Sequence, residues 1–517
     1  MTTASDNAES RKLVYGLLIA VAVGLSLGRL ASVERVNEPS VHKLDEDKIP
    51  RPAWPKTRPS PSPTFGSNDR SRWAVVRALV EKETFVIGKR DRTIILGSGP
   101  ALLAAPDPLG RAVLLEAGYR LQLNRDTGIV FEDGFQTVDK IMDPETGEFY
   151  STKPPLLTMI AAGEYWVMNR VLGWSIVEDR WLVIPLILVT LNIVPFVAYL
   201  LLLTWLAERF GTTDWARYFI VAAGGFATMV TPFLITFNNH TIATAGVALL
   251  LYLVIRLVET AGHGAGWFAL AGLTAGFTAC NELPATAFAV GIGVYLLWRF
   301  PRRTLTLFVP VALVPVAVML ALNVLQFGDW QPAYAKFGGP WYTYEGSHWL
   351  PAGQTKPGID YAGRNGETKA VYAFHLLLGH HGWFSLTPIM FLGLAGMLGQ
   401  LFSPLSRVQR RGEPEEPFRL LALFSLLVSV VVIGYYIMKT DNYGGWSNGP
   451  RWLMWLTPLW LVCMLPILDR LATSRGGRLF ALGLLVVSIL SMSYQFWNPW
   501  RHPWIYVWME SIGRIKY

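Results

Sequence analysis

Residues 181–206 read WLVIPLILVTLNIVPFVAYLLLLTWL, without a charged side chain. A helix that crosses a bilayer needs about 20 mainly apolar residues, so this stretch is expected to span a membrane. Similar apolar stretches lie at residues 13–31, 216–237, 241–258, 267–280, 283–300, 305–325, 384–402, 420–438, 452–468 and 479–496. The sequence therefore predicts an all-α polytopic membrane protein with about eleven transmembrane helices.

The composition agrees with this class. Of the 517 residues, 52% are hydrophobic and 16% are charged, whereas soluble proteins carry about 25% charged residues. The net charge of +8 comes from cations in short loops, where they are expected to orient the chain rather than to bind nucleic acid. Cys280 and Cys463 lie in separate apolar stretches, which favours neither a disulfide nor a cysteine metal site.

The stretch at 155–172 decides the orientation of everything that follows it. If it stays at one membrane surface, arginine-rich loops such as those around Arg256 and Arg302 lie in the cytoplasm, as the positive-inside bias predicts. Glu164 and Trp166 within the stretch also favour an interfacial or re-entrant helix. We therefore expect a cytoplasmic-membrane protein with a cytoplasmic N-terminus and a functional site on the external face. A spanning helix is the alternative.

This orientation predicts a linear plan of cytoplasmic, spanning and external segments. The segments are a cytoplasmic N-terminus at 1–12, the first span at 13–31, a large external loop at 32–154, the interfacial or re-entrant helix at 155–172, spans two to seven at 173–325, an external loop at 326–383, spans eight to eleven at 384–497 and an external aromatic tail at 498–517.

The first external loop has three parts. Prolines through residues 50–63 predict an extended linker. In residues 68–80, NDRSRWAVVRALV, apolar side chains recur every three or four positions, which predicts an amphipathic helix lying on the membrane. Asn68 or Asp69 could cap this helix. From residue 93 to 138, short runs and turns predict a small β-rich cap.

The loop ends in YSTKPPLL at residues 150–157. Lys153 precedes Pro154, which favours an extended backbone, and Pro155 suits the first turn of a helix. The ammonium group would then lie beside a helix N-terminus, where the dipole also favours anions. A phosphate at the membrane surface is the expected ligand, and an ordinary snorkelling lysine is the simpler alternative.

Three stretches resemble motifs of the GT-C class of membrane glycosyltransferases, in particular the branch of protein O-mannosyltransferases and aminoarabinose transferases. Residues 69–77, DRSRWAVVR, are similar to the acidic, aromatic and arginine-containing helix after the family's first span. Residues 150–156, YSTKPPL, look like its Tyr-Ser-acidic-Lys-Pro-Pro-Leu stretch. Residues 449–452, GPRW, with the following Pro458 resemble its Gly-x-Arg motif before a late span.

The resemblance implies a GT-C-like fold and an enzyme that moves a hexosyl or pentosyl group from a polyprenyl-phosphate sugar donor to a lipid, glycan or protein acceptor. Such a reaction needs a carboxylate to activate the acceptor hydroxyl and cations to stabilise the departing phosphate. Asp69 is then the candidate base, Lys153 the leading phosphate contact and Arg451 a second one. Asp139 and Glu282 are the other candidate catalytic carboxylates.

Two departures from the family pattern bear on cofactors. Arg70 stands where many relatives have a second acidic residue, and Thr152 stands where they have an acid before the lysine. Both differences weaken a metal-dependent mechanism built on an acidic cluster. No cofactor is therefore assigned, and a divalent metal stays open.

Further polar side chains at the expected external ends of spans could complete a substrate-binding site. These candidates are Tyr150, Asn239, His240, His380 and His381. Imidazoles can bind a divalent metal, but adjacent histidines usually cannot both face one ion. Anchoring at the membrane interface is the simpler role for each of them.

Two other functions compete with the glycosyltransferase. A transporter or lipid flippase would be expected to carry ionisable groups inside its spans and broken helices in paired repeats. Here the charges gather at span ends, and no internal repeat is visible. A catalytically inactive scaffold that keeps the fold is the third hypothesis, motivated by Arg70 and Thr152.

Overall fold

The chain forms two compact units in the computed structural model, which describes residues 4–32, 62–90, 126–132, 134–349, 368–402, 416–440 and 442–515. The helical unit comprises Met1–Val33, Ile184–Met319 and Gly358–Tyr517, and the mixed unit comprises Glu34–Val183 and Leu320–Pro357. Most of the predicted linker at 50–63 and much of the predicted cap at 93–138 lie outside the described residues.

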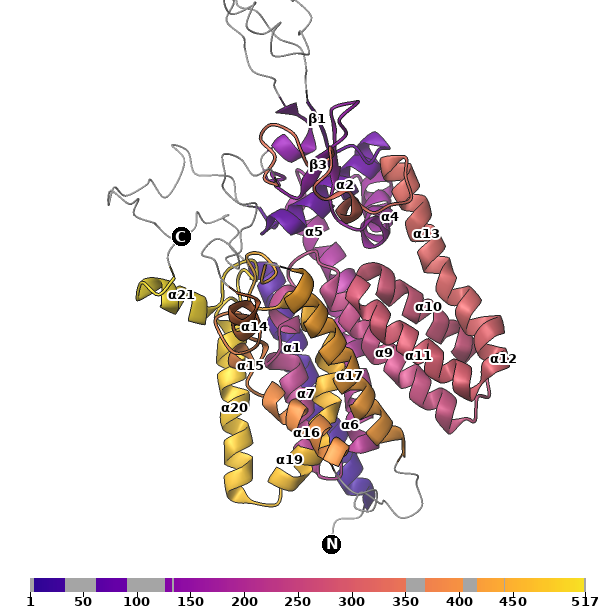
Figure 1. Cartoon of the computed structure of the whole chain (residues 1–517), viewed down its shortest axis with the longest axis vertical. Coiled ribbons are helices and arrows are strands. Elements are labelled where there is room, and N and C mark those ends of the chain that lie inside the picture. The colour runs from indigo at the N-terminus through magenta and orange to yellow at the C-terminus, as the bar shows by residue number, and fades with distance from the viewer. Residues whose placement is uncertain are drawn as a thin grey trace, which may run out of the picture. The chain divides into compact units, whose positions relative to one another are not determined.

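The mixed unit combines helices with a small sheet (Figure 1). Its elements are α2 (Ser67–Lys82), β1 (Gly88–Arg90), β2 (Asp126–Thr127), η1 (Ile129–Phe131), β3 (Lys140–Met142), β4 (Glu148–Ser151), α4 (Pro155–Leu172), the start of α5 (Arg180–Leu188) and η5 (Ala333–Lys336). The strands pair in the order β2-β1-β4-β3, and every pair is antiparallel. This sheet confirms a β-containing segment between the first two long apolar stretches.

A pair of glycines allows β1 and β2 to meet closely. A Cβ on Gly88 would lie 2.9 Å from the carbonyl oxygen of Thr127. Gly128 has φ +102°, and a Cβ there would lie 2.6 Å from the Cα of Gly88. Side chains would separate these backbones, so both positions require glycine.

Helix α2 corrects two sequence expectations. It begins at Ser67 with Gly66 at the N-cap position, so neither Asn68 nor Asp69 is the cap. Most of its side chains are buried, polar ones included, so it is not a helix with one apolar face lying on a surface. The apolar periodicity was real, but the polar side chains of Asn68, Ser71 and Arg72 are buried as well, and Arg72 donates to Asn68.

Helix α4 has the bounds that the sequence predicts, because its ends are set by local residues. Pro155 occupies the first turn, where a missing N–H costs nothing. Gly173 follows the helix with φ +73°, and its N–H donates to the carbonyl of Asn169 at 3.2 Å. This left-handed glycine ends the helix in the usual way. Helix α4 is not among the candidate membrane spans.

The helical unit consists of helices and connecting loops (Figure 1). Its elements are α1 (Ala4–Ser32), the rest of α5, η2 (Val189–Ile193), α6 (Val194–Phe210), α7 (Asp214–Phe226), α8 (Val230–Phe233), α9 (His240–Glu259), α10 (Ala265–Asn281), η3 (Leu283–Ala285), α11 (Thr286–Arg299), α12 (Pro301–Arg303), η4 (Thr304–Phe308), α13 (Val309–Phe327, partly in the mixed unit), α14 (Lys369–Leu377), α15 (Trp383–Leu386), α16 (Met390–Phe402), α17 (Glu416–Lys439), η7 (Arg451–Leu456), α18 (Thr457–Cys463), α19 (Leu465–Leu471), α20 (Arg475–Ser493) and α21 (Trp504–Ser511).

Six helices of the described chain are long and apolar enough to cross a membrane, or seven if one bent pair counts as a span. They are Ala8–Ala31, Arg180–Phe210, His240–Glu259, Pro301–Phe327, Phe418–Lys439 and Arg475–Ser493, and the bent pair is Arg451–Cys463 with Leu465–Leu471. The chain is therefore a multi-pass membrane protein. The expected count of about eleven is not confirmed.

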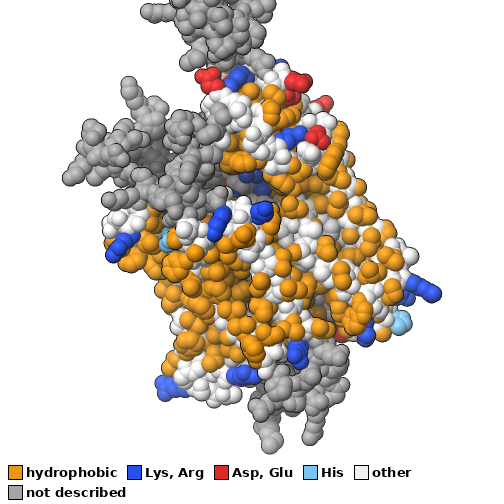
Figure 2. All heavy atoms as spheres, in the orientation of Figure 1, with side chains coloured by type: hydrophobic (Ala, Val, Ile, Leu, Met, Phe, Trp, Pro, Cys, Tyr) orange, Lys and Arg blue, Asp and Glu red, His pale blue; other side chains and the backbone are white. Residues whose placement is uncertain are grey.

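The difference in span count has a local cause. The apolar stretch at 216–237 is interrupted, since α7 ends at Phe226 and the four-residue α8 begins at Val230. Two other expected spans, Leu283–Arg299 and Met390–Phe402, are shorter apolar helices. Hydrophobic side chains cover most of the visible face of the helices (Figure 2), as expected for a surface in contact with lipid.

Candidate functional site

Lys153 and Asp139 form an ion pair in the mixed unit. The Lys153 Nζ donates to Asp139 Oδ1 at 2.6 Å, and the two side chains are 16% and 12% exposed. Lys153 lies two residues after the end of β4 and two before Pro155, which begins α4. The cation predicted from the sequence is thus placed at a helix start, and a carboxylate predicted separately is its partner.

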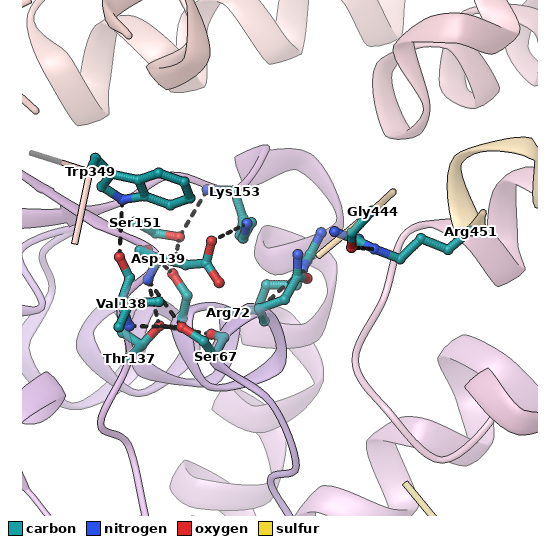
Figure 3. A network of polar contacts seen from close by, with 12 residues as sticks. Ser67, Arg72, Thr137, Val138, Asp139, Ser151, Lys153, Trp349, Gly444 and Arg451 are labelled. Carbon is teal, nitrogen blue, oxygen red and sulfur yellow. Dashed lines mark hydrogen bonds and ion pairs between the residues drawn. The ribbon is translucent and has the colours of Figure 1, made fainter. Parts of the chain in front are cut away.

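Three serines hold the backbone around this pair, and two of them, Ser67 and Ser151, are labelled in Figure 3. Ser71 Oγ donates to the Asp139 carbonyl oxygen at 2.6 Å and lies 2.7 Å from Ser151 Oγ. Ser151 Oγ accepts from the Lys153 N–H at 3.1 Å, and Ser67 Oγ accepts from the Asp139 N–H at the same distance. Hydroxyls from α2 and β4 therefore fix the backbone that carries both charges.

Asp69 lies in the first turn of α2 and is fully buried. Its Oδ2 accepts from the Phe65 N–H at 2.9 Å, and its Oδ1 accepts from Trp73 Nε1 at 2.9 Å. A carboxylate at this position stabilises the helix start, both by these bonds and by the helix dipole. Asp69 therefore has a structural task, whatever chemistry it also performs.

Tyr150 belongs to an aromatic group rather than to the ion pair. Its ring lies 6.0 Å from that of Phe327 and 5.9 Å from that of Trp341, and its hydroxyl donates to Glu148 at 2.9 Å. Burial and the bond to Glu148 raise the pKa of Tyr150. These contacts give Tyr150 a packing role.

Lys140 offers a contrast to Lys153 in the same unit. Its Nζ donates to the Thr137 carbonyl oxygen at 2.7 Å and lies 5.2 Å from the ring centroid of Phe131. Burial lowers the pKa of Lys140. The two lysines carry the same charge in the same unit, but Lys153 lies two residues before helix α4, whereas Lys140 begins strand β3.

In the helical unit, Glu282 gathers two side chains from the start of α9. It lies in an extended link between α10 and η3 and is 5% exposed. Its Oε2 accepts from Asn239 Nδ2 at 2.9 Å and lies 2.5 Å from His240 Nδ1. Asn239 also donates to the Asn281 carbonyl oxygen at 2.6 Å. Three candidates from two turns that are far apart in the sequence therefore come together.

Arg451 extends this network and indicates which ring nitrogen of His240 carries the proton. Its Nη1 lies 3.0 Å from His240 Nε2. Because a guanidinium only donates, Nε2 must be the acceptor, which leaves the ring proton on Nδ1, facing Glu282. The result is a chain from guanidinium through neutral imidazole to carboxylate. We call it the Arg451–His240–Glu282 network.

Arg451 is itself held in place on two sides. Its Nε donates to the Gly444 carbonyl oxygen at 2.8 Å (Figure 3). Its Cζ lies 5.0 Å from the ring centroid of Trp500, within range of a cation–π contact. Gly449, just before it, has φ +118°, a conformation that favours glycine.

His380 and His381 belong to a cluster with His375 and His502. His380 Nδ1 lies 2.5 Å from His381 Nδ1, and His502 Nδ1 lies 3.4 Å from His381 Nε2. The His375 ring stacks on His380 at 4.0 Å, and the Tyr443 ring stacks on His381 at 5.1 Å. The sequence predicted two of these histidines as substrate contacts, and the structure gives them ring packing.

Within the histidine cluster, His380 and His381 are strongly shifted toward their neutral form. Burial, with the nearby His375 and His502, lowers the pKa of His380 to about 2. Burial also lowers the pKa of His381 well below its usual value, and the neighbouring imidazoles add to the effect. Within the described residues, no group of three or more His, Cys, Asp or Glu side chains could hold a metal ion.

Several contributors had little signal in the sequence. Ser71 and Ser151 are 80 residues apart, and Trp500 reaches Arg451 from a different part of the chain. Serine and tryptophan are common at turns and at membrane interfaces, so their types alone did not single them out. An i,i+4 spacing of Ser67 and Ser71 on α2 was the one available hint.

No family model matches the chain, and no curated protein matches it. Among solved structures, the chain is similar to the oligosaccharyltransferase of Archaeoglobus fulgidus in its apo form, with 12% identity and a TM-score of 0.46. The alignment covers 95% of this chain and 56% of the archaeal one. This chain therefore spans little more than half the length of that protein.

Two further solved structures are similar. One is the archaeal oligosaccharyltransferase AglB of the same organism, in complex with an inhibitory peptide and a dolichol-phosphate, with 11% identity, a TM-score of 0.44 and coverage of 95% of this chain and 56% of the other. The other is ArnT from Cupriavidus metallidurans bound to undecaprenyl phosphate, with 12% identity, a TM-score of 0.32 and coverage of 88% and 78%. These are loose likenesses, so residue roles rest on the contacts described above.

Proposed function

We propose that the chain is a membrane glycosyltransferase that moves a hexosyl or pentosyl group from a polyprenyl-phosphate sugar donor to a lipid, glycan or protein acceptor. The observation that carries this proposal is Lys153. It lies two residues before the start of α4, within a motif similar to that of GT-C transferases, and its ammonium lies 2.6 Å from Asp139 Oδ1. A positioned cation at the start of a helix suits a phosphate.

In this proposal, Lys153 stabilises the leaving phosphate. As the bond between the sugar and the phosphate oxygen breaks, negative charge grows on that oxygen, and a nearby cation lowers the energy of the transition state. Asp139 orients the ammonium while the site is empty and gives way to, or shares it with, the phosphate. Helix α4 contributes its N-terminal dipole.

A carboxylate completes the reaction by taking the proton of the acceptor hydroxyl as its oxygen bonds to the sugar. Asp69 is our candidate for this base, and Asp139 and Glu282 are the alternatives. Because Asp69 also supports the start of α2, its replacement has to be judged by activity and stability together. Asp69→Asn keeps the shape of the side chain and removes its charge.

The Arg451–His240–Glu282 network is proposed as a second anion-binding group. Glu282 fixes the tautomer of His240, and His240 in turn fixes one nitrogen of Arg451. An arginine held in this way can bind phosphate oxygens with two parallel N–H groups. Asn239 supports the carboxylate end.

We further propose that the protein lies in the cytoplasmic membrane with its N-terminus in the cytoplasm and its active site on the external face. The arginine distribution over the short loops supports this orientation. The polyprenyl chain and the surrounding membrane lipids would meet the apolar helices.

The decisive experiment compares Lys153→Met with Lys140→Met in purified protein. Transfer would be measured with a panel of undecaprenyl-phosphate and dolichyl-phosphate sugars and lipid, glycan and peptide acceptors, and binding with undecaprenyl phosphate itself. Lys153→Met should lower turnover by at least about 100-fold, while Lys140→Met, which removes a cation of the same unit, should change it less than about threefold.

The other outcomes separate the competing functions. Binding of undecaprenyl phosphate that depends on Lys153, with no turnover for any donor, would favour an inactive scaffold. Flux of the lipid across reconstituted vesicles without bond formation would favour a transporter or flippase. Turnover that survives in Lys153→Met and in Asp69→Asn would overturn the residue assignments.

A further inference from the structure

We propose that Arg29, at the end of α1, is a positioning residue for the Arg451–His240–Glu282 network, an inference that rests on the proposed function of that network. Arg29 is 2% exposed and lies in the last turn of its helix. Its Nη1 donates to the Thr231 carbonyl oxygen at 2.7 Å, and its Nη2 donates to that of Pro232 at 3.2 Å. The guanidinium thus binds the short helix α8, more than 200 residues away in the sequence.

The residue that follows these two carbonyls packs directly against the network. Phe233 is fully buried, and its ring meets the His240 ring edge-on at 6.2 Å. The same ring meets Trp500 edge-on at 5.2 Å, and Trp500 lies under the guanidinium of Arg451. Phe233 therefore supports both His240 and the aromatic platform of Arg451, and Arg29 holds the backbone one residue before it.

A second connection joins Phe233 to the start of α9. Asn238 Nδ2 donates to the Phe233 carbonyl oxygen at 2.8 Å. Asn238 Oδ1 accepts from the Thr241 N–H at 2.9 Å, which ties the first turn of α9 to the same point. Because His240 begins α9, a displacement of Phe233 is transmitted to His240 through a hydrogen bond as well as through ring contact.

Arg29 also contacts the segment that carries Trp500. Its Cζ lies 3.6 Å from the ring centroid of Phe496, four residues before Trp500. One side chain therefore holds both segments whose rings press on the network, one by hydrogen bonds and one by a cation–π contact. Locally, Arg29 satisfies backbone carbonyls in the short helix α8 that follows the break after α7. Through Phe233, the same bonds also hold His240 in position.

The two roles make different predictions in a double-mutant cycle. Arg29→Met should lower turnover about tenfold in the otherwise unchanged protein and less than about twofold in His240→Gln, because the network through which it acts is already broken there. Effects that multiply fully in the double variant would show a merely structural role and overturn the proposal. Arg29→Lys, which keeps the charge, should recover part of the loss.

Arg217→Met is the matched control in the same unit. Arg217 donates to the Gly211 carbonyl oxygen and to Asp214, at the other end of α7 from α8. The substitution therefore removes a partly buried arginine without touching Phe233. It should destabilise the protein without a selective effect on turnover. If it lowers turnover as Arg29→Met does, and its effect likewise nearly disappears in His240→Gln, the proposed specificity of Arg29 is wrong.

A spectroscopic arm does not need turnover. In ¹⁵N-histidine-labelled protein in nanodiscs, the signals of His240 are assigned by their loss in His240→Gln. Wild type should show the proton on Nδ1, and Arg29→Met should shift or broaden this signal while Arg217→Met leaves it unchanged. An unchanged His240 signal in Arg29→Met overturns the positioning role, whereas absent turnover in wild type counts against the proposed function alone.

Discussion

The two polar networks of the molecule use the same charges in different ways. In the mixed unit, a lysine touches its carboxylate directly, and the two side chains are 16% and 12% exposed. In the helical unit, an arginine and a carboxylate are separated by a neutral imidazole, and the His240 and Glu282 side chains are 3% and 6% exposed. The first is a direct ion pair whose side chains are partly exposed. The second is a hydrogen-bonded chain in which the His240 and Glu282 side chains are almost fully buried.

This difference teaches what each network can do. A flexible ammonium in direct contact with one carboxylate can exchange that partner for a phosphate, since both offer oxygen acceptors. A guanidinium that is hydrogen-bonded through a fixed imidazole tautomer loses freedom and gains orientation. Lys153 is thus suited to exchange its carboxylate partner for a phosphate, and Arg451 is suited to bind an anion in one fixed orientation.

The largest expected effect on stability tests whether the direct pair is held only by its charges. Asp139→Asn leaves the half-buried ammonium of Lys153 beside an uncharged amide, which should cost about 2 kcal/mol of unfolding free energy. Reversible denaturation in detergent would measure this cost. Adding Lys153→Met should restore part of it, and a double variant that is less stable than Asp139→Asn would show that the pair is not the source.

The next effect tests the hydrogen-bonded chain. Glu282→Met removes the acceptor of the His240 ring proton, so the imidazole can place that proton on Nε2, toward Arg451. Turnover should then fall about tenfold, comparable to the loss of other groups that orient a functional side chain. Glu259→Met, which removes a carboxylate paired with Arg209 and Arg256, is the control and should change turnover little.

A pH series distinguishes both networks from the histidine cluster. The pKa of His380 is lowered by burial to about 2, so the unfolded chain binds a proton below about pH 6.5 that the folded chain refuses. Stability should therefore be full above pH 6.5 and fall as the pH drops toward 5, by about 1 kcal/mol per pH unit for this group. The midpoint of thermal unfolding would follow it.

His380→Phe is the matching variant for the pH series. It keeps an aromatic ring in the cluster and removes one titrating group, so its unfolding midpoint should depend less on pH than that of wild type. Equal slopes for the two proteins between pH 7 and 5 would contradict the assignment of the effect to His380.

The smallest effect tests the backbone support of the direct pair. Ser71→Ala removes the hydroxyl that joins the Asp139 carbonyl to Ser151, which should lower the unfolding free energy by about 1 kcal/mol. Ser175→Ala, whose hydroxyl accepts from the partly buried Val177 N–H and the exposed Glu178 N–H, should cost less. A Ser71→Ala protein as stable as wild type would mean that the helix α2 contact is dispensable.

Elements whose ends are set by residues within them or next to them could be predicted from the sequence. The bounds of α4 follow from Pro155 and Gly173, each of which acts within one turn. The N-cap of α2 was predicted two or three residues too late, at Asn68 or Asp69 instead of Gly66, because the buried carboxylate of Asp69 accepts the Phe65 N–H from within the first turn. Apolar stretches were recognised, but not the break between α7 and α8.

The candidate residues were predictable by type, but their pairing was not. Lys153 and Asp139 were selected separately, and so were His240, Glu282 and Arg451. Partners that are 42 and 211 residues apart leave no spacing in one sequence by which to match them. Phe233 and Arg29 escaped attention for another reason, since an apolar ring and a cation at a span end are common in any membrane protein.

The closeness of Lys153 to α4 sets a fixed scale along that helix. The exposed apolar side chains of α4 include Ile160, Trp166 and Val171, all borne by the rigid rod that begins two residues after the lysine. At 1.5 Å per residue, Trp166 lies roughly 16 Å along the axis from Pro155. A molecule with a charged head at Lys153 and an apolar tail along α4 must therefore match both the spacing of these side chains along the helix and their direction around it. One residue inserted into α4 would turn the side chains beyond it by about 100°.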